Sequence, residues 1–393
     1  YEEAVRPFYI YGLILAFFIF ITRLVTKSHI RNIFTSIVIQ PQVLLLFGLI
    51  FYFFSSSVFI SSIESGRQIK DILYFSYWVT IIPFLPLLLI DEKMSLDYCI
   101  RSLSKVVVFF AIFSLIFALI IFFNLMPITI AGIEFSQSIY LELRIHGLLG
   151  ESTALAALLG LSMICTYFLS SFNQKNYFYI YVIIFASIFA TGSRNALVSL
   201  FVVFFVGLAL ERLELKKIKL AIIIFFTVMP LILFLLYLIG FFDLVYLIFF
   251  DRPTLDLNSQ LSRINIWITT IDLLINSTPI EILFGHGSYE LRSDLRAGFN
   301  SILEITYDYG IFMGSVYVLI FVLSFFEGLR KYKKSKNKFY KIGILFITYG
   351  FSFSMFMSYF PTTFFNFSIF AFVLGIFMTA IPQKFLSRKL LGS

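Results

Sequence analysis

The first residue whose chemistry can be argued is Arg194, in the Thr-Gly-Ser-Arg-Asn turn at residues 191–195. This turn joins two apolar segments that together span only residues 178–210. Two full membrane crossings need about 40 residues, so we expect the turn to lie below the membrane surface. An unpaired cation at that depth costs roughly 2.5–3.5 kcal/mol or more. Arg194 is therefore expected to bind an anionic ligand, and a snorkelling anchor is the alternative.

A second constellation lies in residues 144–153, directly before the apolar segment 152–170. Its glycines would let the backbone approach a ligand closely, and Glu151 is placed to act as a general base, with His146 as a second candidate. The alternative is structural. A hydroxyl at residues 152–153 caps the helix, Glu151 lies favourably at its positive end, and His146 is only hydrogen-bonded.

A third constellation is spread over the long segment from about 241 to 308. It contains Arg263 with Trp267, and a Phe-Gly-His-Gly turn at 284–287 that could present His286 as a base. A simple solvated loop is the alternative. Further polar residues that could contact a substrate are Arg292, Arg296 and Asn300.

The composition indicates how these residues are positioned. Of 393 residues 60% are hydrophobic and 13% charged, and the mean hydropathy is +0.95. Average soluble chains carry about a quarter charged residues, so a soluble enzyme, a disulfide scaffold and a disordered tail are excluded. With two cysteines and three histidines, we expect no metal site and no cofactor. The sequence predicts an all-α polytopic integral membrane protein.

Spans of about 20 apolar residues predict eleven helices, or twelve if one precedes the chain. We expect the spans near 8–25, 36–60, 73–90, 105–125, 152–170, 178–191, 195–210, 220–240, 309–326, 343–360 and 364–381. They form one membrane-embedded domain, 1–393, with 241–308 as its long external loop. Apolar residues at steps of three and four from Leu261 to Ile275 predict an amphipathic helix in that loop, capped by Asn258 or Ser259.

Basic residues set the orientation. One set of loops holds 21 basic and 6 acidic residues, and the other side holds 9 basic and 16 acidic residues. Because Lys and Arg collect on the cytoplasmic side, the first set is cytoplasmic. The basic balance is thus a topology signal, and we expect no nucleic-acid partner.

The type of cation also differs between the two sides. Lys outnumbers Arg 15 to 6 on the cytoplasmic side, whereas the external side has eight Arg and one Lys, Lys70. A guanidinium is always charged and forks onto phosphate oxygens. The external side is therefore expected to bind a phosphate or diphosphate. Its arginines are Arg6, Arg67, Arg144, Arg194, Arg252, Arg263, Arg292 and Arg296.

Four of these pieces, in this order, resemble the bacterial O-antigen ligase and polymerase family. They are Arg144 to Glu151, the Ser193-Arg194 turn, Arg263 to Trp267, and the 284–287 turn, followed by Asn300, Gly310 and Gly314. The resemblance covers about residues 105–330. Phe299 stands where the ligases have a histidine, and Gly150-Glu151 is similar to a Gly-Glu-Pro stretch of the polymerases, with Ser152 in place of Pro. Both features favour a polymerase.

The resemblance implies a glycosyltransferase of the bacterial inner membrane with its active site facing the periplasm. The donor would be a glycan on undecaprenyl diphosphate and the acceptor a lipid-linked repeat unit, with membrane lipids and a chain-length regulator protein as further partners. Arg194, Arg263 and Arg144 would bind the diphosphate, and Asn300, Arg292 and Arg296 the glycan. The general base stays open among Glu151, His146 and His286.

Three alternatives to the polymerase remain. A ligase would transfer the glycan to lipid A core with the same arginines. A lipid-linked oligosaccharide flippase would be expected to carry its charges along a central cavity within the helices. A non-catalytic scaffold or sensor would not require a submerged arginine at position 194.

Overall fold

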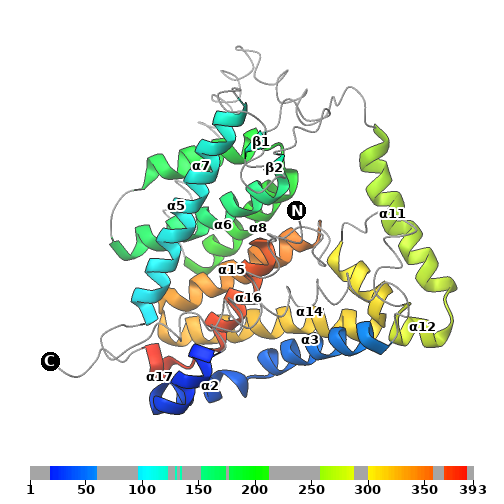
Figure 1. Ribbon diagram of the computed structural model, residues 1–393, viewed down its shortest axis with the longest axis horizontal. Coiled ribbons are helices and arrows are strands. Elements are labelled where there is room, and N and C mark those ends of the chain that lie inside the picture. The colour runs from blue at the N-terminus through cyan, green and yellow to red at the C-terminus, as the bar shows by residue number, and fades with distance from the viewer. Residues whose placement is uncertain are drawn as a thin grey trace.

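The structure is a computed structural model, and it describes residues 18–59, 96–122, 129–130, 133–134, 152–173, 177–211, 257–286, 300–356 and 367–386 (Figure 1). Within these ranges the chain is mainly helical. The exception is a two-stranded antiparallel pair, β1 (Thr129–Ile130) and β2 (Ile133–Glu134). The helices are α2 (Ser28–Val38), α3 (Pro41–Phe59), α5 (Leu96–Phe122), α6 (Ser152–Asn173), α7 (Phe178–Ala190), α8 (Arg194–Glu211), α11 (Leu257–Asn276), α12 (Pro279–Phe284), α14 (Ser301–Ser335), α15 (Lys338–Ser354), α16 (Phe367–Ala380) and α17 (Gln383–Leu386).

Several helices are long and apolar enough to cross a membrane. Within the described ranges these are Tyr98–Ile120, Thr153–Phe172 and Ser301–Ser335, and the pair formed by α2 and α3 would count as a fourth. Shorter apolar helices are Phe178–Ala190, Asn195–Leu210 and Ile369–Ala380. Phe51 and Phe109 are 73% and 71% exposed, as side chains that face lipid would be. The chain is thus a helical membrane protein, as expected, while the predicted spans 73–90 and 220–240 lie outside the described residues.

Several predicted spans differ from the structure at their ends, since α5 begins at Leu96 and not near 105, and α15 begins at Lys338 and not near 343. Two further differences occur at a proline and at acidic residues. The segment predicted as one helix over 36–60 breaks before Pro41, and α2 and α3 meet at an angle of 80°. Proline opens α3 because its ring cannot continue a preceding helix. The helix predicted over 309–326 matches the start of the part of α14 that follows a kink at Gly310, and an additional stretch from Ser301 precedes it, in which Glu304 and Asp308 are buried.

Helices α15 and α16 form the centre of the protein. They pack on each other, with α14 and α3 on one side and α6 and α8 on the other (Figure 1). A Cβ atom at Gly375 would lie 2.7 Å from the Gly343 carbonyl oxygen, so the two backbones touch at these small residues. This contact holds α15 in place, and α15 carries the site described below.

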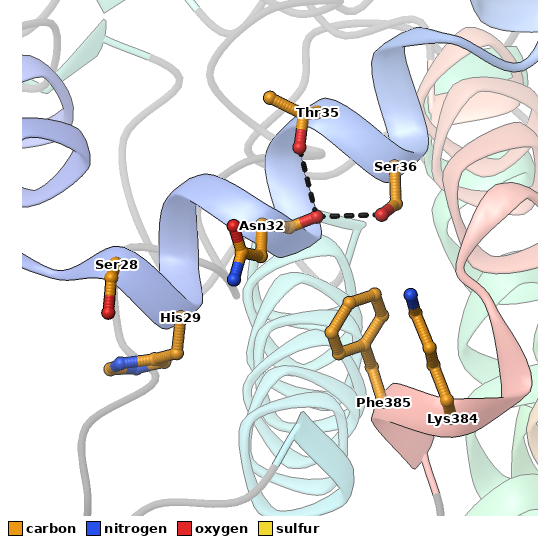
Figure 2. A pocket seen from close by; sticks show the side chains of 7 residues that line it. All are labelled: Ser28, His29, Asn32, Thr35, Ser36, Lys384 and Phe385. Carbon is orange, nitrogen blue, oxygen red and sulfur yellow. Dashed lines mark hydrogen bonds between the residues drawn. The ribbon is translucent and has the colours of Figure 1, made fainter.

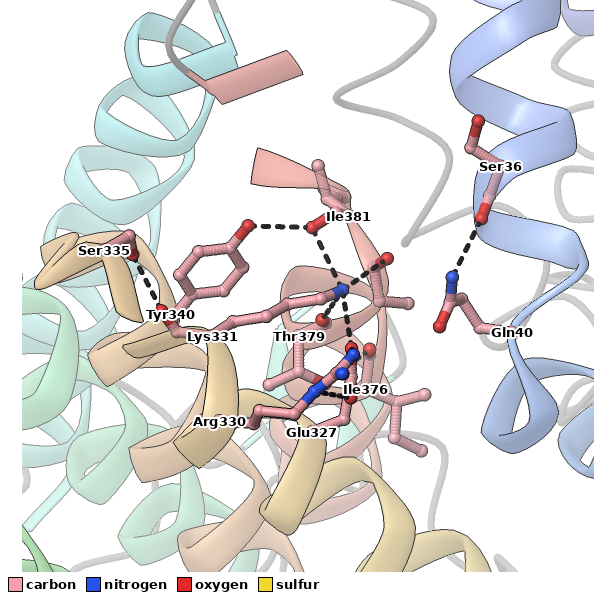
Figure 3. A network of polar contacts seen from close by, with 11 residues as sticks. Ser36, Gln40, Glu327, Arg330, Lys331, Ser335, Tyr340, Ile376, Thr379 and Ile381 are labelled. Carbon is pink, nitrogen blue, oxygen red and sulfur yellow. Dashed lines mark hydrogen bonds and ion pairs between the residues drawn. The ribbon is translucent and has the colours of Figure 1, made fainter. Parts of the chain in front are cut away.

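Lys331 ties the end of α14 to the end of α16. Its Nζ donates to the carbonyl oxygens of Thr379, Ala380 and Ile381 at 2.7, 3.0 and 3.3 Å (Figure 3). Glu327 Oε1 lies 3.3 Å from the same ammonium. The last carbonyls of a helix lack partners within it, so Lys331 caps α16 from a neighbouring helix.

Candidate functional site

The end of α15 brings together two segments that are far apart in the sequence. Asn195 Nδ2, at the start of α8, donates to the Phe356 carbonyl oxygen at 3.0 Å. The Trp267 ring of α11 lies 6.4 Å from the Phe356 ring, centroid to centroid. The turn before α8 and the middle of α11 therefore meet at the residues that follow α15.

The start of α14 also contacts the end of α15. Ser301 Oγ donates to the Ser354 carbonyl oxygen at 2.8 Å, and the Ser354 hydroxyl is 2.9 Å from the Tyr317 hydroxyl. Asn300, predicted to bind glycan, is the N-cap of α14. Its Oδ1 accepts from the backbone N–H groups of Ile302 and Leu303 at 3.0 and 3.2 Å. Asn300 thus fixes where α14 begins, beside the end of α15.

The turn between α7 and α8 is buried within the protein. Gly192 has a φ of 63°, a left-handed conformation that glycine adopts without strain. Thr191 Oγ1 donates to the Ile188 carbonyl oxygen at 2.6 Å and accepts from the Ser193 backbone N–H at 3.3 Å. Thr191 is 0% exposed. Helix α7 has 13 residues, about 20 Å of helix, which is shorter than the hydrocarbon thickness of about 30 Å.

His286 lies between the end of α11 and the first half of α14. Its Nδ1 is 3.2 Å from the Tyr307 carbonyl oxygen, and its ring stacks on the Tyr307 ring at a centroid distance of 4.2 Å. Its Nε2 is 2.9 Å from Ser277 Oγ, whose proton goes to the Leu273 carbonyl oxygen at 2.6 Å. Both ring nitrogens are therefore engaged by oxygens of the protein.

Glu281 supplies a carboxylate close to that ring. Its Oε2 lies 4.0 Å from His286 Nε2. It also accepts from the Thr278 backbone N–H and hydroxyl, both at 2.8 Å, in a capping box at the start of α12. These hydrogen bonds, with His286 nearby, lower the pKa of Glu281 below its ordinary value. The carboxylate therefore lies beside the same ring nitrogen that Ser277 contacts.

No protein-family model and no curated protein matches the chain.

The predicted site residues are described to different extents. Arg194 opens α8 directly before Asn195, and Arg263 lies one turn before Trp267 on α11, but their side chains fall outside the described part of the chain. The structure thus brings the backbone positions of both predicted diphosphate ligands to the end of α15. The predicted residues Arg144, His146, Glu151, Arg292 and Arg296 lie outside the described residues.

An apolar groove begins beside the turn at 191–195. It has a volume of about 530 Å³ and lies between α6, α7, α8 and α15. Phe189 and Leu197 line it close to the turn, and Tyr167 and Leu345 line it further along. A groove with aromatic and aliphatic walls suits a hydrocarbon chain.

Sequence reasoning missed the residues that bring the motifs together. Phe356 is one of 53 phenylalanines, and Ser354 and Ser277 are single hydroxyls, so no pattern distinguishes them. Tyr307 lies in a stretch expected to be loop. Only the packing of α15 against its neighbours identifies these positions.

Proposed function

We propose that this protein is a polysaccharide repeat-unit polymerase, a glycosyltransferase with its active site on the periplasmic face of the bacterial inner membrane. The observation that supports it is the meeting of two sequence motifs at the end of α15. Asn195 follows Arg194, Trp267 follows Arg263 by one turn, and both contact Phe356. Two arginines whose backbones lie near the same end of α15 would suit a diphosphate better than a lone arginine that only anchors a helix.

The reaction is a substitution at the anomeric carbon of the donor glycan. A hydroxyl of the acceptor repeat unit attacks that carbon, and the bond to the undecaprenyl diphosphate oxygen breaks. Arg194, Arg263 and Arg144 stabilise the charge that develops on the leaving diphosphate, so the step needs no metal ion. A base removes the proton of the attacking hydroxyl, and one base with no covalent intermediate gives inversion.

Glu151 is the preferred base, with His146 as the alternative. His286 is the weaker candidate because Ser277 and Tyr307 already engage its two ring nitrogens. Asn300, Arg292 and Arg296 are proposed to contact the glycan. The apolar groove beside the turn at 191–195 would hold a polyprenyl chain of the donor or acceptor.

The proposed topology has eleven or twelve spans and a cytoplasmic basic end. Helices α8 and α14 begin near the site and run toward the end of the bundle that carries Lys333, Lys334 and Lys338 (Figure 1). Because basic residues favour the cytoplasm, that end is inside and the site is outside. The long segment 241–308, which includes α11 and α12, is then periplasmic.

The test is a gel of surface polysaccharide from a strain that lacks the protein and is complemented with variants. We expect single repeat units on lipid A core without complementation, and the same with Arg194→Ala or Arg263→Ala at normal membrane abundance. The matched control is Arg330→Ala, since Arg330 is exposed at the opposite end and paired with Glu327 at 2.8 Å. It should restore the ladder.

Three results would contradict the proposal. A normal ladder from both arginine variants would remove the diphosphate site. Polymer that persists on the lipid carrier while core stays unmodified would make the protein a ligase. Unchanged glycans in the deletion strain would exclude both activities.

A further inference from the structure

A polar cavity of about 520 Å³ lies between α2 and α17, at the opposite end of the bundle from the site above (Figure 2). Helix α2 contributes most of its lining, and α17 closes it with Lys384 and Phe385. The lining residues of α2 are Ser28, His29, Asn32, Thr35 and Ser36. A cavity lined by a lysine, an imidazole, an amide and hydroxyls is unusual in a chain that is 60% hydrophobic.

The polar face of α2 faces α17. The opposite face of α2 carries Ile30, Ile33 and Ile37, which are 0%, 8% and 1% exposed. The 80° bend before Pro41 turns α2 away from the direction of α3. If α3 crosses the membrane, α2 lies along its surface as an amphipathic helix, at the depth of lipid headgroups.

The cavity offers donors of hydrogen bonds and positive charge. Ser28 Oγ, the His29 ring, Asn32 Nδ2 and Lys384 Nζ have no hydrogen-bond partner among the described residues. The Lys384 ammonium lies 5.0 Å from the centre of the Phe385 ring, which orients it without neutralising it. Ser28, Asn32 and Lys384 are exposed, so their donors are accessible to a ligand with several acceptor oxygens.

The remaining hydroxyls are already used within α2. Thr35 Oγ1 and Ser36 Oγ donate to the Asn32 carbonyl oxygen at 3.1 and 2.7 Å (Figure 2). These hydrogen bonds stay within α2, so the two hydroxyls stabilise the helix that carries three of the four donors. No carboxylate occurs in residues 4–63 or 328–393, the stretches that contain α2 and α17. The nearby sequence therefore supplies no acidic side chain to satisfy Lys384.

We propose that this cavity binds a phosphate group. Lysine binds phosphate as a point charge, and the amide, imidazole and hydroxyl donors would contact further oxygens. The group could come from an anionic lipid headgroup at the membrane surface or from a soluble phosphate. This site is separate from the proposed diphosphate site, which lies at the other end of α8 and α14.

The experiment uses His29 as the probe. The chain contains three histidines, so isotope labelling of histidine gives three ring signals, and His29→Gln identifies the signal of His29. The protein is purified in a maltoside detergent, which contains no phosphate. In one arm inorganic phosphate is added, with chloride at equal ionic strength as the control. In the other arm phosphatidylglycerol is added, with a phosphate-free diacyl glycolipid as the control.

We expect the His29 signal to shift and saturate with a phosphate-containing probe and not with its control. A response to phosphatidylglycerol alone identifies the lipid headgroup, and a response to inorganic phosphate identifies the soluble ion. Lys384→Gln should weaken binding by about tenfold or more, because a charge-assisted hydrogen bond is lost. Lys334→Gln, the same change at an exposed lysine of α14, should leave binding within about twofold.

The wild-type arms test the proposal even if a variant fails to fold. No shift of the His29 signal with either probe would overturn it. Equal binding by folded Lys384→Gln and Lys334→Gln would overturn it as well, since the phosphate would then lie elsewhere. Asn32→Leu, which keeps the charge and removes an amide donor, should also weaken binding.

Discussion

Gly285 and Gly310 lie against each other's neighbouring backbone. A Cβ atom at Gly285 would be 2.3 Å from the Asp308 carbonyl oxygen, and one at Gly310 would be 2.0 Å from the Leu283 carbonyl oxygen. Both residues have positive φ angles, 83° and 88°. The end of α12 therefore fits into a kink of α14, and two glycines 25 positions apart in the sequence form one contact.

This contact predicts opposite outcomes for two glycine-to-alanine changes. Gly310→Ala should lower the free energy of unfolding by about 1–3 kcal/mol, because its φ of 88° and ψ of 163° are almost restricted to glycine, and further through the clash with Leu283. Gly48→Ala in α3 should be neutral or stabilising, since nothing lies within 4 Å of its Cβ position and alanine favours helix. Thermal unfolding of the purified protein measures both. Equal stability of the two variants would show that the contact is not formed.

The hydrogen bonds of His286 predict that it is not the general base. Glu151→Gln should lower turnover by about 10²–10⁴-fold with donor binding retained. His286→Gln should lower it by less than about tenfold, because both ring nitrogens of the histidine already contact Ser277 and Tyr307. Chain extension by purified protein from lipid-linked repeat units gives both values. A folded His286→Gln variant as inactive as Glu151→Gln would reassign the base.

The capping box of α12 predicts a dependence of stability on pH. The folded pKa of Glu281 is below its ordinary value of 4.5, so its charged form stabilises the protein above that pH. The stabilisation is lost as the pH falls through the folded pKa. Glu281→Gln keeps the shape of the cap but not the charge. The difference in unfolding temperature between wild type and Glu281→Gln should therefore shrink as the pH falls below 4.5. A constant difference would contradict the prediction.

The cap that Lys331 gives α16 predicts a large effect for the loss of one ammonium. Lys331→Met would leave the carbonyls of residues 379–381 without that partner. We expect it to lower the free energy of unfolding by about 1–3 kcal/mol. Lys334→Met removes the same charge from an exposed position of α14 and should change stability by less than about 0.5 kcal/mol. Unfolding in detergent compares them. Similar losses would mean that the charge and not the cap is responsible.

Hydropathy predicted helices where apolar runs are continuous and failed where packing outweighs polarity. The helices expected over 178–191 and 195–210 agree with α7 and α8 to within one residue. The first turns of α14 were missed because Glu304 and Asp308 lower the local hydropathy, although both are buried.

The candidate site was predictable as a set of motifs but not as an arrangement. The turn before α8 and the Arg263–Trp267 stretch each have a recognisable composition. Their meeting depends on Phe356, whose carbonyl and ring contact Asn195 and Trp267. Such contacts arise from how α15 is placed by α16, and no local pattern contains that information.

The lysines at the basic end of the bundle suggest why this end carries more lysine than arginine. Lys338 donates to the Ser171 carbonyl oxygen and Lys341 to the Tyr167 hydroxyl, so α15 is attached to α6, as Lys331 attaches α14 to α16. A compact ammonium on a flexible stem can point into a ring of carbonyls that a planar guanidinium does not fit. Exchanging these lysines for arginines would preserve the charge that sets the orientation and loosen the helices it orients.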